Sequence, residues 1–202
     1  MSGDERTGLR ERTRRAVRAE LSDLAVRLFL ERGYERTTVE DIAAAAGMSK
    51  RSFFRYFPSK EDAVFGEAED VAEQVAEAIR ARPEGEPPWA CLCAVLREQQ
   101  EAIRSAQPGL RTLRLIEATP ALRARLHAER DRMRELITAA LREHSGAGLD
   151  AFTADLLTGT AAAALEAADR EWMRSDGAAD RAALLDRAFA LLSPSAGGQG
   201  IR

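Results

Sequence analysis

Apolar side chains recur along this chain at the three- and four-residue spacing that buries one face of a helix. The first helix is expected over residues 12–32, and Gly33 follows at a point where a helix can end. Its buried face would hold Val17, Leu21, Leu24, Ala25 and Leu28. Runs of β-branched residues are almost absent, so the pattern predicts an all-α fold.

Two short helices are expected next. Thr37 and Glu40 have the spacing of a capping box and predict a helix over residues 39–46, which Gly47 ends. Ser49 would cap a third helix that runs to Phe57.

Pro58 cannot continue the hydrogen bonding of that third helix, so a fourth begins after it. Ser59 would cap the fourth helix, which is expected to run without a break to about Ala81. Such a helix would be a rod that connects the beginning of the chain with the rest.

A loop rich in proline and glycine, residues 82–88, separates a small head from a larger body. The expected helices of the body cover residues 89–105, a short stretch after Pro108, a longer one from Pro120 to His144, and residues 150–175 and 179–192. The chain therefore has about nine expected helices. The expected domains are a flexible N-terminal tail at 1–11, a head at 12–62, a body at 63–192 and a flexible C-terminal tail at 193–202.

Charge is unevenly distributed along the chain. Residues 1–60 hold 13 Lys/Arg against 9 Asp/Glu, a balance of +4, although the whole chain carries −3. A basic head on an acidic body favours a local surface for a polyanion.

The helices on either side of Gly47 have the composition of a helix-turn-helix. Ala43 is small enough for a steep crossing, and Gly47 permits the left-handed backbone of a tight turn. The expected core around the turn consists of Ile42, Ala46, Met48 and Phe53. The outward face of the third helix carries Lys50, Arg51, Ser52, Phe54 and Arg55, side chain types that reach phosphates and base edges. The pattern predicts that residues 49–57 enter the major groove of double-stranded DNA.

These residues resemble the TetR family of transcriptional regulators. The stretch SKRSFFRYFPSK, from Ser49 to Lys60, is similar to the signature of that family, and Gly33-Tyr34 with Thr37-Thr38 matches its lead-in. Phe54 stands where a tyrosine is more usual, and Arg55 stands where the family often has histidine. The resemblance implies a homodimeric, all-helical regulator, expected to be a repressor, that binds a palindromic operator and is released by a small molecule.

The resemblance also implies roles for single residues. Thr38, Tyr56 and Lys60 would contact phosphates, whereas Lys50, Arg51, Ser52 and Arg55 would lie nearest the bases. The full set of expected DNA-binding residues is Thr38, Ser49, Lys50, Arg51, Ser52, Phe54, Arg55, Tyr56 and Lys60.

An effector site is expected among the helices of the body. Its candidate residues are Trp89, Leu92, Leu96, Gln99, Leu113, Ile116, Met133 and Thr160. Most are apolar, which favours a hydrophobic or amphipathic effector. Apolar residues at helical spacing are equally the pattern of a plain core.

Small residues and a leucine/phenylalanine stripe on the last two helices predict a dimer interface. The expected interface residues are Gly159, Ala163, Ala167, Leu185, Phe189 and Leu192. Packing within one chain is the alternative interpretation of the same pattern.

Other classes of protein find little support. No Ser/His/Asp set, phosphate loop or metal-ligand spacing appears, so we expect neither an enzyme nor a cofactor or metal. Cys91 and Cys93 are two apart, a poor spacing for a metal clamp or a disulfide, and neither His127 nor His144 has a second ligand at the required spacing. No signal peptide or apolar run of about 20 residues is present, which favours a cytoplasmic protein without a membrane partner. A DNA-binding regulator whose body serves only dimerisation or protein contacts remains an alternative.

Overall fold

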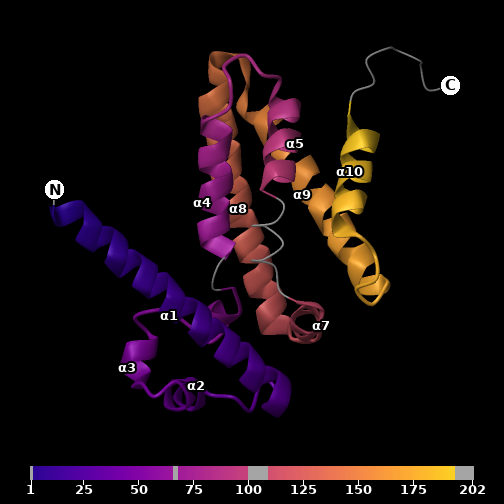
Figure 1. Cartoon of the computed structure of the whole chain (residues 1–202). Coiled ribbons are helices and arrows are strands. Elements are labelled where there is room, and N and C mark those ends of the chain that lie inside the picture. The colour runs from indigo at the N-terminus through magenta and orange to yellow at the C-terminus, as the bar shows by residue number, and fades with distance from the viewer. Residues whose placement is uncertain (1, 66–67, 100–108, 194–202) are drawn as a thin grey trace. The chain divides into compact units, whose positions relative to one another are not determined.

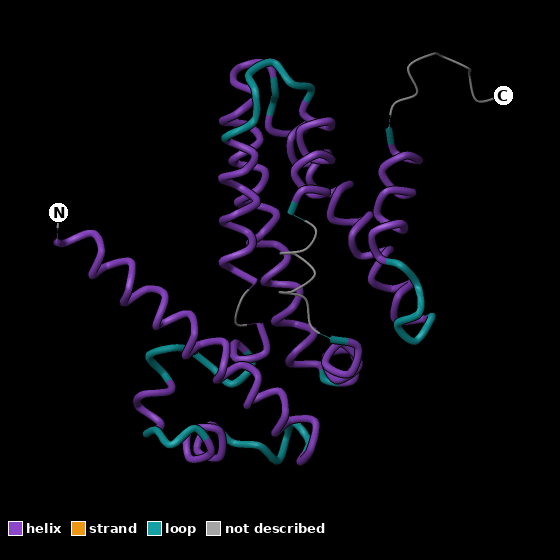
Figure 2. The backbone as a smooth tube through the Cα atoms, viewed as in Figure 1, coloured by secondary structure: helices purple, strands orange, loops and turns teal. Residues whose placement is uncertain are grey.

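The computed structural model describes residues 2–65, 68–99 and 109–193. Within those ranges all regular structure is helical and no strand occurs (Figure 2). The α-helices there number nine: α1 (Ser2–Arg32), α2 (Val39–Ala45), α3 (Lys50–Phe53), α4 (Ala68–Arg80), α5 (Pro88–Glu98), α7 (Leu110–Ala118), α8 (Pro120–Ser145), α9 (Ala151–Arg174) and α10 (Arg181–Leu192). Two 3-10 helices, η1 (Asp62–Phe65) and η2 (Gly146–Gly148), complete the set. The all-α prediction is confirmed.

The chain forms two compact units. The first consists of Met1–Asp70 with Ala106–Arg130, and the second of Val71–Ser105 with Asp131–Arg202. The first unit therefore contains α7 and the first part of α8 in addition to the helix-turn-helix. The functional division into a head at 12–62 and a body at 63–192 stays a prediction.

The first unit is built on α1, which packs against α2, η1 and α7 (Figure 1). Leu21, Ala25 and Phe29 are buried on this helix, and the Ser22 hydroxyl donates to the Ala63 carbonyl at 2.6 Å. The helix begins at Ser2 rather than near residue 12, and the flexibility of the tail over residues 1–11 stays a prediction. Good helix formers and alternating charges continue through this stretch, with no proline to stop the helix.

The expected fourth helix, from Ser59 to Ala81, is not a single continuous α-helix. Ser59 does act as a cap, but of the 3-10 helix η1, since the Asp62 amide donates to its hydroxyl at 3.3 Å. Ala63, Val64 and Phe65 are all buried. Three consecutive buried side chains do not fit the single apolar stripe of an α-helix, and the tighter turn directs all three into the core. The α-helix begins only at Ala68, and residues 66–67 lie outside the described ranges.

The second unit packs α9 against α5 and α10 (Figure 1). Ala154, Ala161, Ala164 and Ala168 form the buried side of α9. Alanines leave room for neighbouring helices to approach closely, so the long α9 can pack against two helices at once. Val71, Val75 and Ile79 form a buried stripe of α4 with the spacing of one helix face.

Acidic caps fix where the last two helices begin. The Thr153 amide donates to Asp150 at 3.0 Å at the start of α9, and Asp180 caps α10 in the same way. Residues 100–105 of the expected helix 89–105, and the expected tail from residue 194 on, lie outside the described ranges. None of the described helices is both long and apolar enough to cross a membrane.

Candidate nucleic-acid interface

The first helix of the motif, α2, begins with a complete capping box. The Asp41 amide donates to the Thr38 hydroxyl oxygen at 3.1 Å, and the Thr38 amide donates to Asp41 Oδ2 at 2.8 Å. The expected pair, Thr37 and Glu40, is therefore wrong by one residue. Thr37 is instead buried, and its hydroxyl donates to the Gly33 carbonyl at 2.9 Å. That hydroxyl secures the turn after α1, and the Thr38 hydroxyl one residue later caps α2.

Gly47 makes the turn between α2 and α3. Its φ is +66°, in the left-handed region that disfavours side chains with a Cβ atom. The Gly47 amide donates to the Ala44 carbonyl at 3.1 Å, and the Met48 amide donates to the Ala43 carbonyl at 2.9 Å. This pair of bonds is a Schellman motif, which ends α2 and reverses the chain. The predicted turn is confirmed.

The second helix of the motif is shorter than expected. Ser49 caps it, since the Ser52 amide donates to the Ser49 hydroxyl at 3.1 Å, but α3 ends at Phe53 rather than Phe57. Beyond it the Tyr56 amide bonds the Phe53 carbonyl at 2.9 Å, so the chain continues as a tighter turn. Phe53 and Phe57 are both buried, with ring centroids 5.7 Å apart. The Phe57 amide also donates to the Phe53 carbonyl, at 3.1 Å, so the two rings keep the four-residue spacing that places them on one side.

The outward face of residues 50–55 is basic. Lys50, Arg51 and Arg55 are exposed, and the Phe54 ring is 45% exposed among them. Within the described part of the chain, the side chains of Arg51 and Arg55 make no hydrogen bond or ion pair. Two extended guanidinium groups beside an open ring can reach phosphate oxygens or the acceptor edge of guanine.

Lys50 has a partner on α2. Its ammonium group lies 2.5 Å from Glu40 Oε1 and 5.9 Å from the centroid of the Phe54 ring. The ammonium group holds the pKa of Glu40 below its ordinary value. Both side chains are more than half exposed, so the pair contributes little to stability and a phosphate could displace Glu40.

Three further expected DNA contacts are less accessible. Ser52 and Tyr56 are half-buried, and the Ser52 hydroxyl lies 3.0 Å from that of Ser49. The Thr38 hydroxyl is exposed but donates to Asp41 at 2.6 Å. An acceptor on DNA would have to compete with that carboxylate.

Lys60 is tied into the fold, which the sequence pattern did not reveal. Its ammonium group donates to the carbonyls of Tyr34 at 3.1 Å and Thr37 at 3.3 Å, and it lies 3.9 Å from the centroid of the Tyr34 ring. The Tyr34 hydroxyl in turn donates to Glu61. Lys60 thus fastens the loop between α1 and α2 to the segment before η1, and its expected phosphate contact stays a prediction.

The expected effector residues belong to different units. Leu113 and Ile116 are buried in the first unit, whereas Leu92 and Leu96 are buried in the second. The rest of the set lies in the second unit and is half-buried: Trp89, Gln99, Met133 and Thr160. The Trp89 ring packs edge-on against Phe189, with centroids 5.8 Å apart. Its Nε1 is buried and has no hydrogen-bond partner among the described residues.

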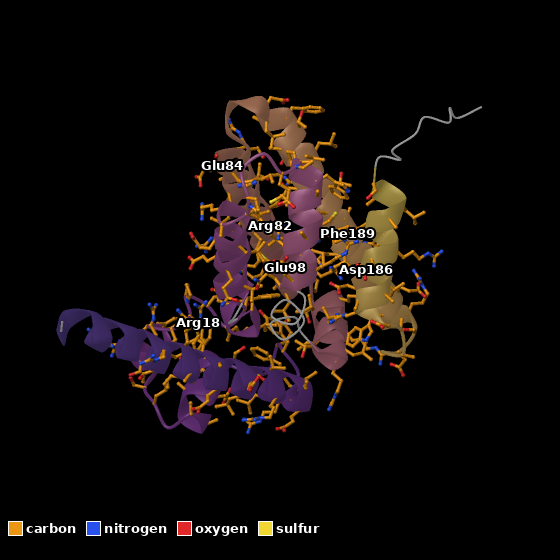
Figure 3. The ribbon with its side chains drawn as sticks, turned by 45° about the horizontal axis from the view of Figure 1, so that its top comes forward. Arg18, Arg82, Glu84, Glu98, Asp186 and Phe189 are labelled. Carbon is orange, nitrogen blue, oxygen red and sulfur yellow. The ribbon has the colours of Figure 1, made fainter. Side chains whose placement is uncertain are left out.

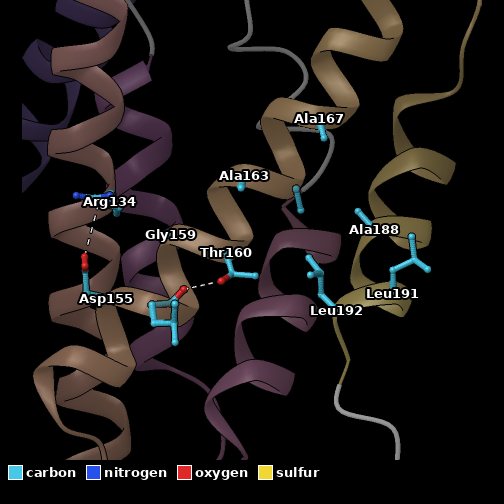
Figure 4. Close-up of a pocket in the computed structure, with 11 residues that line it drawn as sticks. Arg134, Asp155, Gly159, Thr160, Ala163, Ala167, Ala188, Leu191 and Leu192 are labelled. Atoms are coloured by element: carbon cyan, nitrogen blue, oxygen red, sulfur yellow. Dashed lines mark hydrogen bonds and ion pairs between the residues drawn. The ribbon is translucent and has the colours of Figure 1, made fainter. Parts of the chain in front are cut away.

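The expected dimer residues divide into two groups. Leu185 and Phe189 are buried inside the second unit, which agrees with the alternative of packing within one chain, and their place in a dimer interface stays a prediction. Gly159, Ala163, Ala167 and Leu192 instead line an open groove of about 600 Å³ between α9 and α10 (Figure 4). Leu191, which the sequence analysis missed, also lines it and is 77% exposed. Helical periodicity identified the stripe on α10 but not which of its sides packs inward.

Known proteins resemble both parts of the chain. Residues 21–65 match the family described as bacterial regulatory proteins, tetR family, and residues 86–197 match the MftR C-terminal domain. The HTH-type transcriptional regulator TcmR of Streptomyces glaucescens is 32% identical over 178 residues, which cover 84% of this chain and 79% of TcmR. The HTH-type transcriptional repressor KstR2 of Rhodococcus jostii is 53% identical over 47 residues, 23% of each chain.

Among solved structures, FadR of Thermus thermophilus shares the fold. FadR is a TetR-family transcriptional repressor, solved in complex with lauroyl-CoA. The two structures superpose with a TM-score of 0.57 at 24% identity, covering 90% of this chain and 100% of FadR.

Proposed function

The chain belongs to the TetR family of bacterial regulatory proteins, whose members are DNA-binding transcriptional regulators, and we propose that it is a ligand-responsive repressor acting in the cytoplasm. In this proposal residues 12–62 bind a palindromic operator, and residues 63–192 mediate dimerisation and bind a small effector. Repression is favoured by the resemblance to KstR2, itself a repressor.

The observation that carries the proposal is the exposed basic face after the Ser49 cap. The cap and the Gly47 turn fix the start of α3, and the buried Phe53 and Phe57 fix its rotation. Arg51 on α3 and Arg55 in the turn that follows it are therefore held outward, as readout of base edges requires. We assign base contacts to these two arginines and to Lys50, and phosphate contacts to Thr38, Tyr56 and Lys60.

The α9/α10 groove supports a homodimer. Its floor is made of small residues, Gly159, Ala163 and Ala167, and its rim carries the exposed Leu191 and Leu192 (Figure 4). The same surface therefore has a recess that can accept a large apolar side chain and exposed leucines that can fill such a recess. Such a surface is complementary to itself, which is the requirement of a two-fold symmetric interface. The proposed occupant of the groove is therefore a second copy of the chain.

An amphipathic effector is the second element of the proposal. Trp89 supports it, because its buried Nε1 donor has no partner in the described structure and leaving such a donor unpaired is costly. Lauroyl-CoA, present in the FadR complex, combines an apolar chain with polar groups. It is therefore the first probe to use.

The experiment is selection of an operator from random duplex DNA, followed by fluorescence anisotropy with and without lauroyl-CoA. We expect enrichment of a palindrome, two chains bound per site, and weaker operator binding when the acyl-CoA is added. A typical coupling of about 1–3 kcal/mol corresponds to a five- to 150-fold weakening. Enrichment of a palindrome with no response to any acyl-CoA would favour a regulator whose body serves dimerisation alone. No enrichment of any sequence would contradict the proposal.

A further inference from the structure

Three side chains with metal-binding atoms converge in the second unit, which does not contain the helix-turn-helix motif. Glu86 lies in the loop before α5, Cys91 in the first turns of α5, and His144 in the last turn of α8. The thiol sulfur, a ring nitrogen and a carboxylate oxygen all lie within 4.8 Å of one another. Ligand atoms around tetrahedral zinc are about 3.5 Å apart, so small side-chain rotations bring these three to a common centre.

The cluster is shielded and incompletely satisfied. Cys91 is fully buried, and the Glu86 side chain is 19% exposed. His144 Nε2 is buried and has no hydrogen-bond partner within the described residues. A buried imidazole nitrogen without a hydrogen-bond partner is costly to the folded state. Coordination of a cation would satisfy the ring.

The net charge of the side chains around the cluster would neutralise a divalent cation. Arg82 donates to both Glu86 oxygens at 2.8 Å and, through its other terminal nitrogen, to Glu98 at 2.9 Å. Arg82 and Glu98 are labelled in Figure 3. The guanidinium and the two carboxylates together carry −1, and a Cys91 thiolate would bring the total to −2. Arg82 also fixes the orientation of the Glu86 carboxylate while leaving each oxygen a further lone pair, as residues behind metal ligands commonly do.

We propose that Glu86, Cys91 and His144 form a binding site for Zn²⁺ or a similar borderline-soft divalent cation. One thiolate, one imidazole and one carboxylate suit such a cation better than Mg²⁺ or Ca²⁺, which prefer oxygen ligands alone. On binding, the Cys91 thiol loses its proton to solvent and the sulfur–metal bond replaces the S–H bond. Three protein ligands leave the fourth tetrahedral position open to water or an exogenous ligand. The cation would join the beginning of α5 to the end of α8.

Cobalt(II) substitution tests the site directly. Tag-free protein is stripped with chelator, dialysed and titrated with Co²⁺, and the near-ultraviolet band of sulfur-to-cobalt charge transfer is recorded. The chain has only two cysteines, which makes the assignment unambiguous. We expect the band to saturate at one equivalent per chain, to disappear in Cys91→Ala and to persist in Cys93→Ala. Cys93 is also buried but lies outside the cluster.

The histidines provide a second matched pair. His144→Asn should weaken Co²⁺ binding by more than about tenfold, whereas His127→Asn, at an exposed position on α8, should not. Zn²⁺ should raise the Tm of the wild type and of Cys93→Ala, because a cation that binds only the native state stabilises it. Circular dichroism checks that each variant folds. If Cys91→Ala fails to fold, the Co²⁺ affinities of His144→Asn and His127→Asn provide the same test of the site. A band that survives in Cys91→Ala, unchanged affinity in His144→Asn, or no band at stoichiometric Co²⁺ would overturn the proposal.

Discussion

At the scale of single residues, the helix-turn-helix holds cations in two different environments. Arg51 and Arg55 extend from the exposed face and make no ion pair within the described structure. Lys60 is half-buried, and its ammonium group is held by two carbonyls and the Tyr34 ring. The arginines can bind DNA at no cost to the fold, whereas Lys60 must give up internal bonds to do so. Substitution should therefore affect affinity in the first case and stability in the second.

Arg51→Ala and Arg55→Ala should each weaken operator binding by about 1–3 kcal/mol and relax specificity at one base pair, because a bidentate contact to guanine is lost. The stability of the protein should not change, since neither side chain packs inward. Fluorescence anisotropy on the operator and on single-base variants provides the measurement. Arg142→Ala, which removes an exposed arginine from α8, is the matched control. Equal losses in Arg142→Ala would mean that charge alone, not position, is responsible.

Lys60→Ala should lower the free energy of unfolding by about 1–3 kcal/mol, through loss of the two carbonyl bonds and the contact with the Tyr34 ring. Urea denaturation measures this effect without DNA. The salt dependence of operator binding then shows whether Lys60 also meets a phosphate, since each lost phosphate contact flattens the slope by about one unit. A variant as stable as the wild type would show that the observed bonds contribute nothing.

At the scale of elements, caps decide where the helices of the motif begin. The Thr38 hydroxyl and backbone bonds to Asp41 hold the pKa of that carboxyl below its ordinary value. A lowered pKa in the folded state means that the ionised carboxylate stabilises the fold. This contribution is complete at neutral pH and is lost as the pH falls through the lowered pKa.

Asp41→Asn should therefore destabilise the protein at neutral pH, and the difference from the wild type should shrink on acidification. Glu40→Gln is the matched control, because Glu40 is adjacent in sequence but pairs only with the exposed Lys50. Urea unfolding curves at several pH values provide the measurement. If Glu40→Gln proved the more damaging variant, the capping box would be in the register first expected, with Thr37.

Sequence periodicity identified the helices because each buries a single stripe, as with Val71, Val75 and Ile79 on α4. It failed at Ala63, Val64 and Phe65, where three consecutive residues are buried and only a tighter turn accommodates them. It also extended α3 too far, because Phe53 and Phe57 have helical spacing whether or not the helix continues between them.

The sequence predicted only those features of the candidate sites that depend on residues close together in the chain. The turn glycine, the Ser49 cap and the basic face are local features, and local spacing predicts them. The Lys60 contacts join residues 23 and 26 positions apart. The candidate metal ligands come from a loop and two helices, and His144 lies far from Cys91 in the sequence. Such groupings depend on tertiary packing, which no spacing rule encodes.

At the scale of the whole molecule, the proposed two-fold assembly would place two recognition elements on one palindromic operator. Half-sites one helical turn apart require two recognition elements held about 34–36 Å apart. The α9/α10 groove, with its small-residue floor and leucine rim, is the surface proposed to set this separation. Because Phe189 is buried against Trp89, its substitution would test folding rather than assembly.

Leu191→Glu should therefore produce folded monomers with poor operator affinity, because it places a charge on an exposed apolar rim. Arg187→Glu, at an exposed position of α10 outside the groove, should remain dimeric. Light scattering gives the mass, and circular dichroism confirms the fold. An intact Leu191→Glu dimer would remove the groove from the interface.

The central claim is that a dimer reads DNA through the basic face that contains Arg51 and Arg55. Hydroxyl-radical footprinting on the selected operator tests it most directly, with wild-type protein and the Arg51→Ala/Arg55→Ala double variant at equal dimer concentration. The account predicts two symmetric protected half-sites, centred about 34–36 Å apart or a multiple of that distance, for the wild type. It predicts no protection for the folded, dimeric double variant. The same two-part footprint from the double variant would contradict the account.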